Sequence, residues 1–171
     1  MAHCQSFPPI ASPTARVLIL GSMPGVASLR HQQYYAHPRN AFWPIMGALF
    51  DAGLEYDYAT RCARLIAHGI AVWDVLRQCE RPGSLDAAIL PESMVVNDFL
   101  GFFASHCYIE RVYFNGGTAE RLFRQWASPQ LALHSAKTFC CKRLPSTSPA
   151  HAGLSLDEKI TAWRVIRDDT L

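Results

Sequence analysis

The feature that most constrains the fold is an alternation of short apolar runs with longer helical patterns. The apolar runs have the composition of buried strands and lie at residues 16–23, 70–76, 111–114 and 137–144. Apolar residues at helical spacing lie at 40–52, 58–68, 95–106 and 119–126, and again from residue 155. Strands that alternate with helices predict a parallel sheet covered on both faces. We expect an α/β protein with three αβα layers around a central four-stranded parallel sheet.

Local signals predict where several of these helices begin and end. Gly69 follows the second helical pattern and is expected at its C-terminal cap. Thr118 is expected to cap the helix after the third strand. Ser155 and Glu158 have the spacing of a capping box, which predicts the start of the last helix.

The length of 171 residues indicates one domain with a sizeable core. We expect residues 1–15 to be a loose, Pro-rich lead-in and residues 16–171 to be the domain. The start of the chain lacks the features of a secretory signal, and no apolar run is long enough to span a membrane, so a cytoplasmic location is expected. Six cysteines include no CxxC pair, and we expect neither a metal site nor a cofactor.

Charge is distributed unevenly along the chain. Residues 1–50 and 121–156 contain no Asp or Glu, and thirteen of the sixteen basic residues are Arg. If the two acid-free segments converge in space, they form a positive face of the kind that nucleic acids or phosphates require. Chance segregation of charge explains the same pattern equally well.

Three loops at the predicted strand ends are rich in polar and small residues, at 21–39, 115–117 and 145–151. Ligands of open parallel sheets bind beyond the carboxyl ends of the strands. The first loop is unusually long for a compact domain, and its aromatic content argues against disorder. It is therefore expected to be an active-site loop.

Individual residues in these loops have a structural and a functional interpretation. Tyr35 offers a face for stacking a base, or packs within the loop, as is expected for Tyr34. Asn40 is either a helix cap or a polar site residue, and Asn115 is either part of a turn or an amide that binds a heterocycle. The hydroxyl side chains at 146–148 indicate either a surface turn or a loop that binds a phosphate.

Several motifs in fixed order resemble the uracil-DNA glycosylase superfamily over residues 16 to about 166. GSMPG at 21–25 matches its strand-end motif, and LPS at 144–146 matches its late motif. YAHPRNAFW at 35–43 is similar to the F-A-H-P-x-N-R-F-W sequence of the mismatch-specific branch. The chain also contains the motifs GIAVWDVL, GSLD, FNGG and LPSTSPA in this order. Together with the motifs above, they make it most similar to the hypoxanthine-DNA glycosylase branch.

The sequence departs from uracil-excising relatives at two positions of these motifs. Met23 stands where those relatives have a water-activating Asp or Asn, and Leu144 stands where they often have His or Asn. In the hypoxanthine branch the polar role is attributed to the asparagine of H-P-R-N, which is Asn40 here.

The resemblance implies a monofunctional DNA-deoxyinosine glycosylase that acts in base excision repair on double-stranded DNA with a deaminated base. It implies Asn40 as the catalytic residue. The implied base-binding residues are Gly21, Ser22, Met23, Pro24, Tyr35 and Asn115. The implied DNA-binding residues are Arg39, Arg143, Ser146, Thr147, Ser148 and His151. We expect a monomer that is not membrane-bound, and no lyase activity, because these loops contain no lysine to form a Schiff base.

Two alternatives remain open at this point. A sister enzyme would excise uracil or xanthine, including from G:U or G:T mismatches. A protein of another class would bind damaged DNA or a nucleotide without cleaving it, which Met23 and Leu144 would permit.

Overall fold

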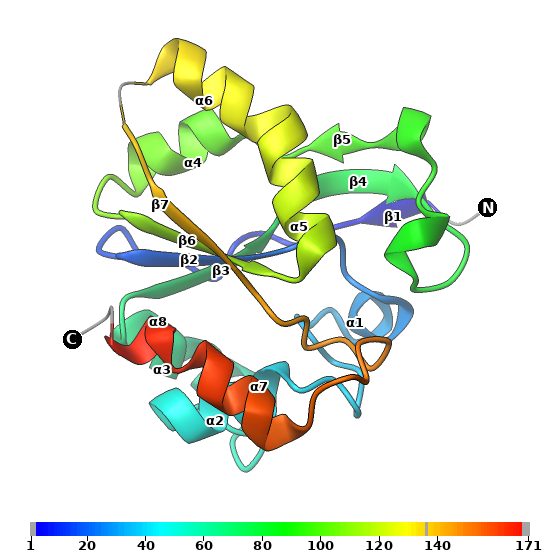
Figure 1. Cartoon of the computed structure of the whole chain (residues 1–171), viewed down its shortest axis with the longest axis vertical. Coiled ribbons are helices and arrows are strands. Elements are labelled where there is room, and N and C mark those ends of the chain that lie inside the picture. The colour runs from blue at the N-terminus through cyan, green and yellow to red at the C-terminus, as the bar shows by residue number, and fades with distance from the viewer. Residues whose placement is uncertain (1–2, 136, 169–171) are drawn as a thin grey trace.

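A computed structural model describes residues 3–135 and 137–168. Its centre is a four-stranded parallel sheet with the strand order β3-β2-β6-β7 (Figure 1). The strands are β2 (Val17–Gly21), β3 (Ile70–Asp74), β6 (Arg111–Asn115) and β7 (Cys140–Leu144). All of β2 and β3 is buried, as expected for central strands with helices on both faces.

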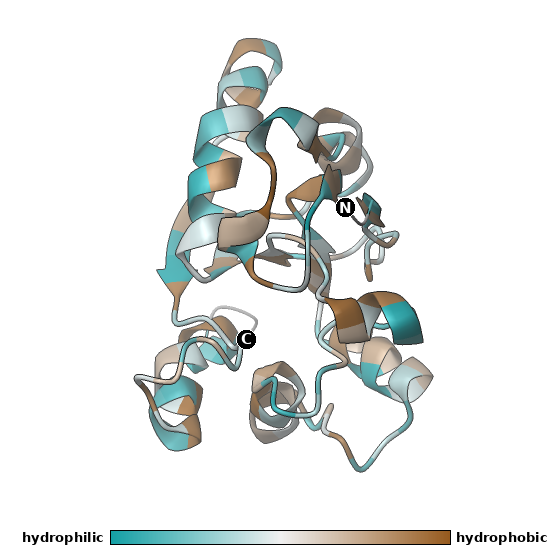
Figure 2. Cartoon of the chain, turned by 90° about the vertical axis from the view of Figure 1, so that its right-hand side faces the viewer, coloured by the Kyte–Doolittle hydropathy of each residue, from teal (hydrophilic) through white to brown (hydrophobic). Residues whose placement is uncertain are grey.

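Helices cover both faces of this sheet, which confirms the three αβα layers (Figure 1). One layer consists of α2 (Phe42–Phe50), α3 (Tyr58–Ala67), α7 (Leu156–Trp163) and α8 (Val165–Asp168). The other consists of α4 (Phe99–Ser105), α5 (Gly117–Leu122), the π-helical turn η3 (Phe123–Ala127) and α6 (Ser128–His134). The helices carry both apolar and polar segments, as helices with one face on a sheet should (Figure 2). No helix in the described residues is long and apolar enough to cross a bilayer.

A small antiparallel sheet lies beside the central one, with the order β1-β4-β5. It consists of β1 (His3–Gln5), β4 (Leu76–Glu80) and β5 (Val95–Val96). The expectation of a loose lead-in at residues 1–15 is therefore wrong for the described residues 3–15. Beyond β1, Ile10 also bridges Val72 of β3, so backbone pairing orders this segment.

Several helix boundaries differ from the sequence expectation. The helix expected at 95–106 begins only at Phe99, because β-branched Val95 and Val96 pair with β4 and Asp98 caps the helix. Thr118 is not a cap, since α5 begins at Gly117 after Gly116, whose φ of 93° suits glycine. The fourth strand begins at Cys140 rather than at 137.

Other local signals are confirmed. Gly69 has φ 71° and follows the end of α3. Ser155 and Glu158 form the capping box of α7. The remaining short helices border the loops of the site and are α1 (Val26–His31), η1 (Asp86–Ala88) and η2 (Pro91–Ser93).

Candidate active site

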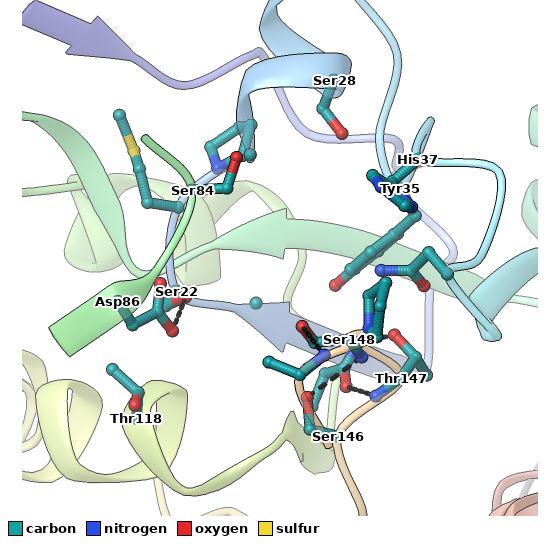
Figure 3. A pocket seen from close by; sticks show the side chains of 18 of the residues that line it. Ser22, Ser28, Tyr35, His37, Ser84, Asp86, Thr118, Ser146, Thr147 and Ser148 are labelled. Atoms are coloured by element: carbon teal, nitrogen blue, oxygen red, sulfur yellow. Dashed lines mark hydrogen bonds between the residues drawn. The ribbon is translucent and has the colours of Figure 1, made fainter. Parts of the chain in front are cut away.

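A cavity of about 490 Å³ opens at the carboxyl ends of the parallel strands (Figure 3). This size suits a small organic ligand such as a base. Its lining comes from residues 21–25, 27–28, 34–35, 84–86 and 146–151, together with His37, Asn40, Asp74, Asn115 and Thr118. The acid-free segments therefore do converge here, yet the lining also includes two acids, Asp74 and Asp86.

The fold brings most of the predicted site residues to this cavity. Those that line it are Gly21, Ser22, Met23, Pro24, Tyr35, Asn40, Asn115, Ser146, Thr147, Ser148 and His151. Arg39 and Arg143 are exposed and are not part of the lining. The Arg143 Nε lies 3.6 Å from a carboxylate oxygen of Glu120.

Tyr35 is held in a backbone conformation that is rare for a bulky residue, with φ 57°. Its ring stacks on Phe42 at 4.0 Å between centroids and an interplanar angle of 22°. Its buried hydroxyl forms no hydrogen bond within the described residues, although the Asn115 amide lies nearby. Burial and the Asp74 carboxylate raise the pKa of this hydroxyl, so it stays protonated. Strain and an unpaired buried hydroxyl together indicate a functional position.

Tyr34 packs beneath the loop, as expected. It is 2% exposed, and its hydroxyl lies 3.1 Å from the carbonyl oxygens of both Phe7 and Pro8. Its carbonyl accepts a hydrogen bond from the Trp43 indole N–H at 2.8 Å. These bonds fix the backbone that positions Tyr35.

Asn40 lies one residue before Ala41, the N-cap of α2, and also lines the cavity. Its Oδ1 accepts a hydrogen bond from the Phe42 N–H at 2.9 Å, at the start of α2. Its Nδ2 forms no hydrogen bond within the described part of the chain and remains available to a ligand or a water. The N-cap expected at Asn40 is therefore Ala41, while the Asn40 amide holds the start of α2 through Phe42 and keeps Nδ2 for a function.

Two hydrogen bonds join Asn115, at the end of β6, to Thr147 in the loop at 145–151 (Figure 3). We call this loop the late loop and the pair of bonds the clamp. The Asn115 amide donates to the Thr147 hydroxyl at 2.9 Å and accepts from the Thr147 N–H at 2.8 Å. Thr147 is 1% exposed, so the expectation that its side chain contacts DNA is wrong. Asn115 lines the cavity and holds the loop, with one amide hydrogen left for a ligand.

The rest of this loop is stiffened by local bonds and by α7. The hydroxyls of Ser146 and Ser148 each accept a hydrogen bond from a backbone N–H two residues on, at 3.2 Å. Lys159 Nζ donates to the His151 carbonyl at 2.8 Å, and the Trp163 indole donates to the Pro145 carbonyl at 2.9 Å. The loop is thus a preformed edge of the cavity.

The GSMPG turn forms the opposite wall and is fixed by a buried network. Ser22 Oγ donates to Asp86 Oδ2 at 2.6 Å (Figure 3). Arg81 is fully buried, donates to the Pro24 carbonyl at 2.5 Å, and places Nη1 3.7 Å from Asp86 Oδ1. Met23 is only 6% exposed. The wall therefore presents backbone and an apolar side chain in a fixed position.

Sequence reasoning missed the two acids of the cavity. Asp74 is 2% exposed, and its Oδ2 accepts a hydrogen bond from the Ser6 hydroxyl at 2.7 Å. Burial raises the pKa of the Asp74 carboxyl to about 7. Burial also raises the pKa of Asp86, against the hydrogen bond from Ser22 and the charge of Arg81. An available signal was that Asp74 interrupts the apolar run at 70–76, where a parallel strand would end.

Comparisons with known proteins agree with this geometry. The profile of the family described as "Uracil DNA glycosylase superfamily" matches residues 8–167. A hypoxanthine DNA glycosylase of Methanosarcina barkeri is 36% identical over 113 residues, covering 66% of this chain and 70% of that protein. One of Methanosarcina acetivorans is 31% identical over 163 residues, covering 95% and 96% of the two chains. A solution NMR structure from Methanosarcina acetivorans, provisionally assigned as a uracil DNA glycosylase, has a TM-score of 0.77 and 29% identity over 99% of both chains.

Proposed function

Because the chain belongs to the uracil DNA glycosylase superfamily, we propose that this DNA glycosylase removes hypoxanthine from deoxyinosine in double-stranded DNA. The observation that carries this proposal is the cavity itself. It combines an aromatic face, an amide and backbone donors at the strand ends. The two motif positions that carry polar residues in uracil-excising relatives are occupied here by the buried apolar residues Met23 and Leu144. The relatives named as hypoxanthine DNA glycosylases support the choice of base.

The substrate nucleotide would be flipped out of the duplex into the cavity. Extrusion costs roughly a few kcal/mol and is easiest for a mispaired base. Phe42 covers one face of the Tyr35 ring, so the other face is the one that would stack on the purine. Backbone at Ser22 and Met23 and the remaining amide hydrogen of Asn115 would bind the polar edge of the base.

Asn40 would orient the attacking water toward C1′ through its free Nδ2. The hydrogen bond that Asn40 Oδ1 accepts from the Phe42 N–H holds the amide in place, which reduces the cost of ordering it. Since the mechanism uses no carboxylate nucleophile, the transition state would be dissociative, with positive charge on the sugar and negative charge on the departing base. The nearby Lys159 amine is bound to the His151 carbonyl and is not part of the lining, which favours a monofunctional enzyme.

Exposed residues around the cavity would bind the DNA backbone. Arg39 and Arg143 supply positive charge, and Ser146, Ser148 and His151 lie on the stiff loop that would contact the strand and wedge the minor groove. Thr147 supports this loop from within. The protein would act as a monomer.

The test uses duplex oligonucleotides with a single deoxyinosine, deoxyuridine or deoxyxanthosine, incubated with the protein and then cleaved with alkali. We expect strand breaks at deoxyinosine. Breaks at deoxyuridine alone would refute the base specificity. A gel shift with no breaks on any substrate would instead support a binding module of another class.

A further inference from the structure

Asp74 is a buried acid in the cavity that the mechanism above does not use. It ends β3, where its Cα is paired in register with that of Gly21 on the wall of the base pocket. Among the described residues, no Arg, Lys or His forms an ion pair with it. Arg81, whose charge acts on Asp74, is bound to the Pro24 and Gly83 carbonyls and lies beside Asp86. A buried acid without a cation is costly to keep ionised and calls for a functional explanation.

The two oxygens of Asp74 have different surroundings. Oδ2 accepts the Ser6 hydroxyl at 2.7 Å. Oδ1 has no hydrogen-bond partner within the part of the chain that the structure describes, and it lies over Gly21, 2.5 Å from where a Cβ would stand. The unpaired Tyr35 hydroxyl lies 2.9 Å from that same position. Asp74 Oδ1 and the buried Tyr35 hydroxyl, neither of which has a hydrogen-bond partner among the described residues, thus lie around one region of the cavity wall, where a ligand can pair with them.

The surroundings also decide where a proton on Asp74 would reside. Because Ser6 donates to Oδ2, a proton taken up by the carboxyl is directed to Oδ1, on the cavity side. The titratable groups that face Asp74 are Asp86, Tyr34 and Tyr35, with Arg81 as the fixed charge. Burial and Asp86 raise the pKa of Asp74, which is about 7, while Ser6 and Arg81 lower it. A substantial fraction of the carboxyl is therefore protonated at neutral pH.

We propose that Asp74 is the general acid of this glycosylase, and that its Oδ1–H donates a proton to a ring acceptor of the departing purine. The proposal rests on the proposed hypoxanthine excision. As the bond between C1′ and N9 breaks, its electron pair stays on the base, and the Asp74 proton converts the leaving anion to neutral hypoxanthine. The oxygen of the attacking water bonds to C1′, and the proton that this water loses reprotonates Asp74 through solvent. Protonation of a poor leaving group is the kind of assistance that contributes about 10²–10⁴-fold in rate.

The experiment measures single-turnover excision from a deoxyinosine duplex between pH 5.5 and 9. We expect the wild-type rate to fall about tenfold per pH unit above pH 7, as the acid form is lost. Asp74→Asn keeps the shape but has no transferable proton, so its rate should be about 10²-fold lower or more and flat across this range. Ser6→Ala removes a hydrogen bond that stabilises the Asp74 carboxylate, which raises the pKa of Asp74. The descending limb of the pH–rate profile should therefore move to higher pH.

Two controls separate this role from a structural one. Asp57→Asn changes an exposed acid that caps α3, where Asn caps as well, and it should keep the wild-type rate and pH profile. Thermal unfolding and a gel shift with the same duplex check that Asp74→Asn folds and binds. An Asp74→Asn variant that keeps the wild-type rate, or that is slow but keeps the descending limb, overturns the general acid. Wild-type protein that cleaves no deoxyinosine at any pH refutes the proposed function instead.

Discussion

Gly21 and Asp74 are register partners at the carboxyl ends of β2 and β3, and the Asp74 carboxyl occupies the space that a side chain on Gly21 would need. A Cβ on Gly21 would stand 2.5 Å from Asp74 Oδ1 and 2.9 Å from the Tyr35 hydroxyl. Glycine at this position is therefore required by the packing of two cavity residues and not by its backbone conformation, because its φ is not positive.

Gly21→Ala should displace the Asp74 carboxyl or the Tyr35 ring. We expect a loss of about 1–3 kcal/mol in the free energy of unfolding, as for other overpacked sites, and a clear loss of excision rate. Urea unfolding and single-turnover excision measure the two effects. Gly153→Ala is the matched control, since a Cβ there meets no atom within 4 Å. Equal behaviour of the two variants would contradict the steric argument.

Asn40→Ser should separate the structural role of Asn40 before α2 from its catalytic role. The serine hydroxyl can also accept a hydrogen bond from the N–H two residues on, so the stability should change by less than about 0.5 kcal/mol. The amide that would orient the water is lost, and the excision rate should fall by about 10²-fold. A variant with the wild-type rate would remove Asn40 from the mechanism and leave it with a structural role alone.

Thr147→Val should break one bond of the clamp while keeping the shape of the side chain. It leaves the Asn115 amide without its partner, which costs about 1–3 kcal/mol for a buried donor. We expect lower stability and weaker binding to duplex DNA by fluorescence anisotropy, because the late loop loosens. Thr14→Val, at an exposed residue before β2, is the control. If DNA affinity were unchanged, the loop would not depend on the clamp.

The contribution of Asp74 to the stability of the wild-type protein should decrease as the pH rises from about 4 to 7. Over this range Asp74 stays protonated in the folded state, with a pKa of about 7, whereas it ionises in the unfolded chain near its ordinary value of 3.8. The folded state then binds more protons, so the contribution of this group falls by about 1.4 kcal/mol per pH unit and levels off above pH 7.

Asp74→Asn should lack this part of the pH dependence. Urea unfolding at pH 5, 6, 7 and 8 compares the two proteins, and the difference in their free energies should change by a few kcal/mol over the series. Parallel pH curves for wild type and variant would mean that Asp74 ionises normally.

The sequence predicted the central sheet and its layers because the patterns that specify them are local. The apolar run at 17–20 and the helical spacing at 42–50 depend only on near neighbours. The site residues could be predicted for a related reason, since Tyr35 and Asn40 lie on the loop that follows the first predicted strand and Asn115 lies at the end of the third. Helix starts at Phe99 and Gly117 were misplaced because strand pairing and a glycine turn overrode local propensity.

By itself, the sequence determined a parallel α/β sheet whose polar loops meet at the carboxyl ends of its strands, because hydrophobic periodicity and loop composition are properties of contiguous residues. Only the tertiary structure decided which side chains share a hydrogen bond across the chain. Ser6 and Asp74 are 68 residues apart, and Ser22 and Asp86 are 64 apart. The protonation of Asp74 follows from burial and from these long-range partners, so it depends on an environment that exists only once the strands, the N-terminal segment and the loops have come together.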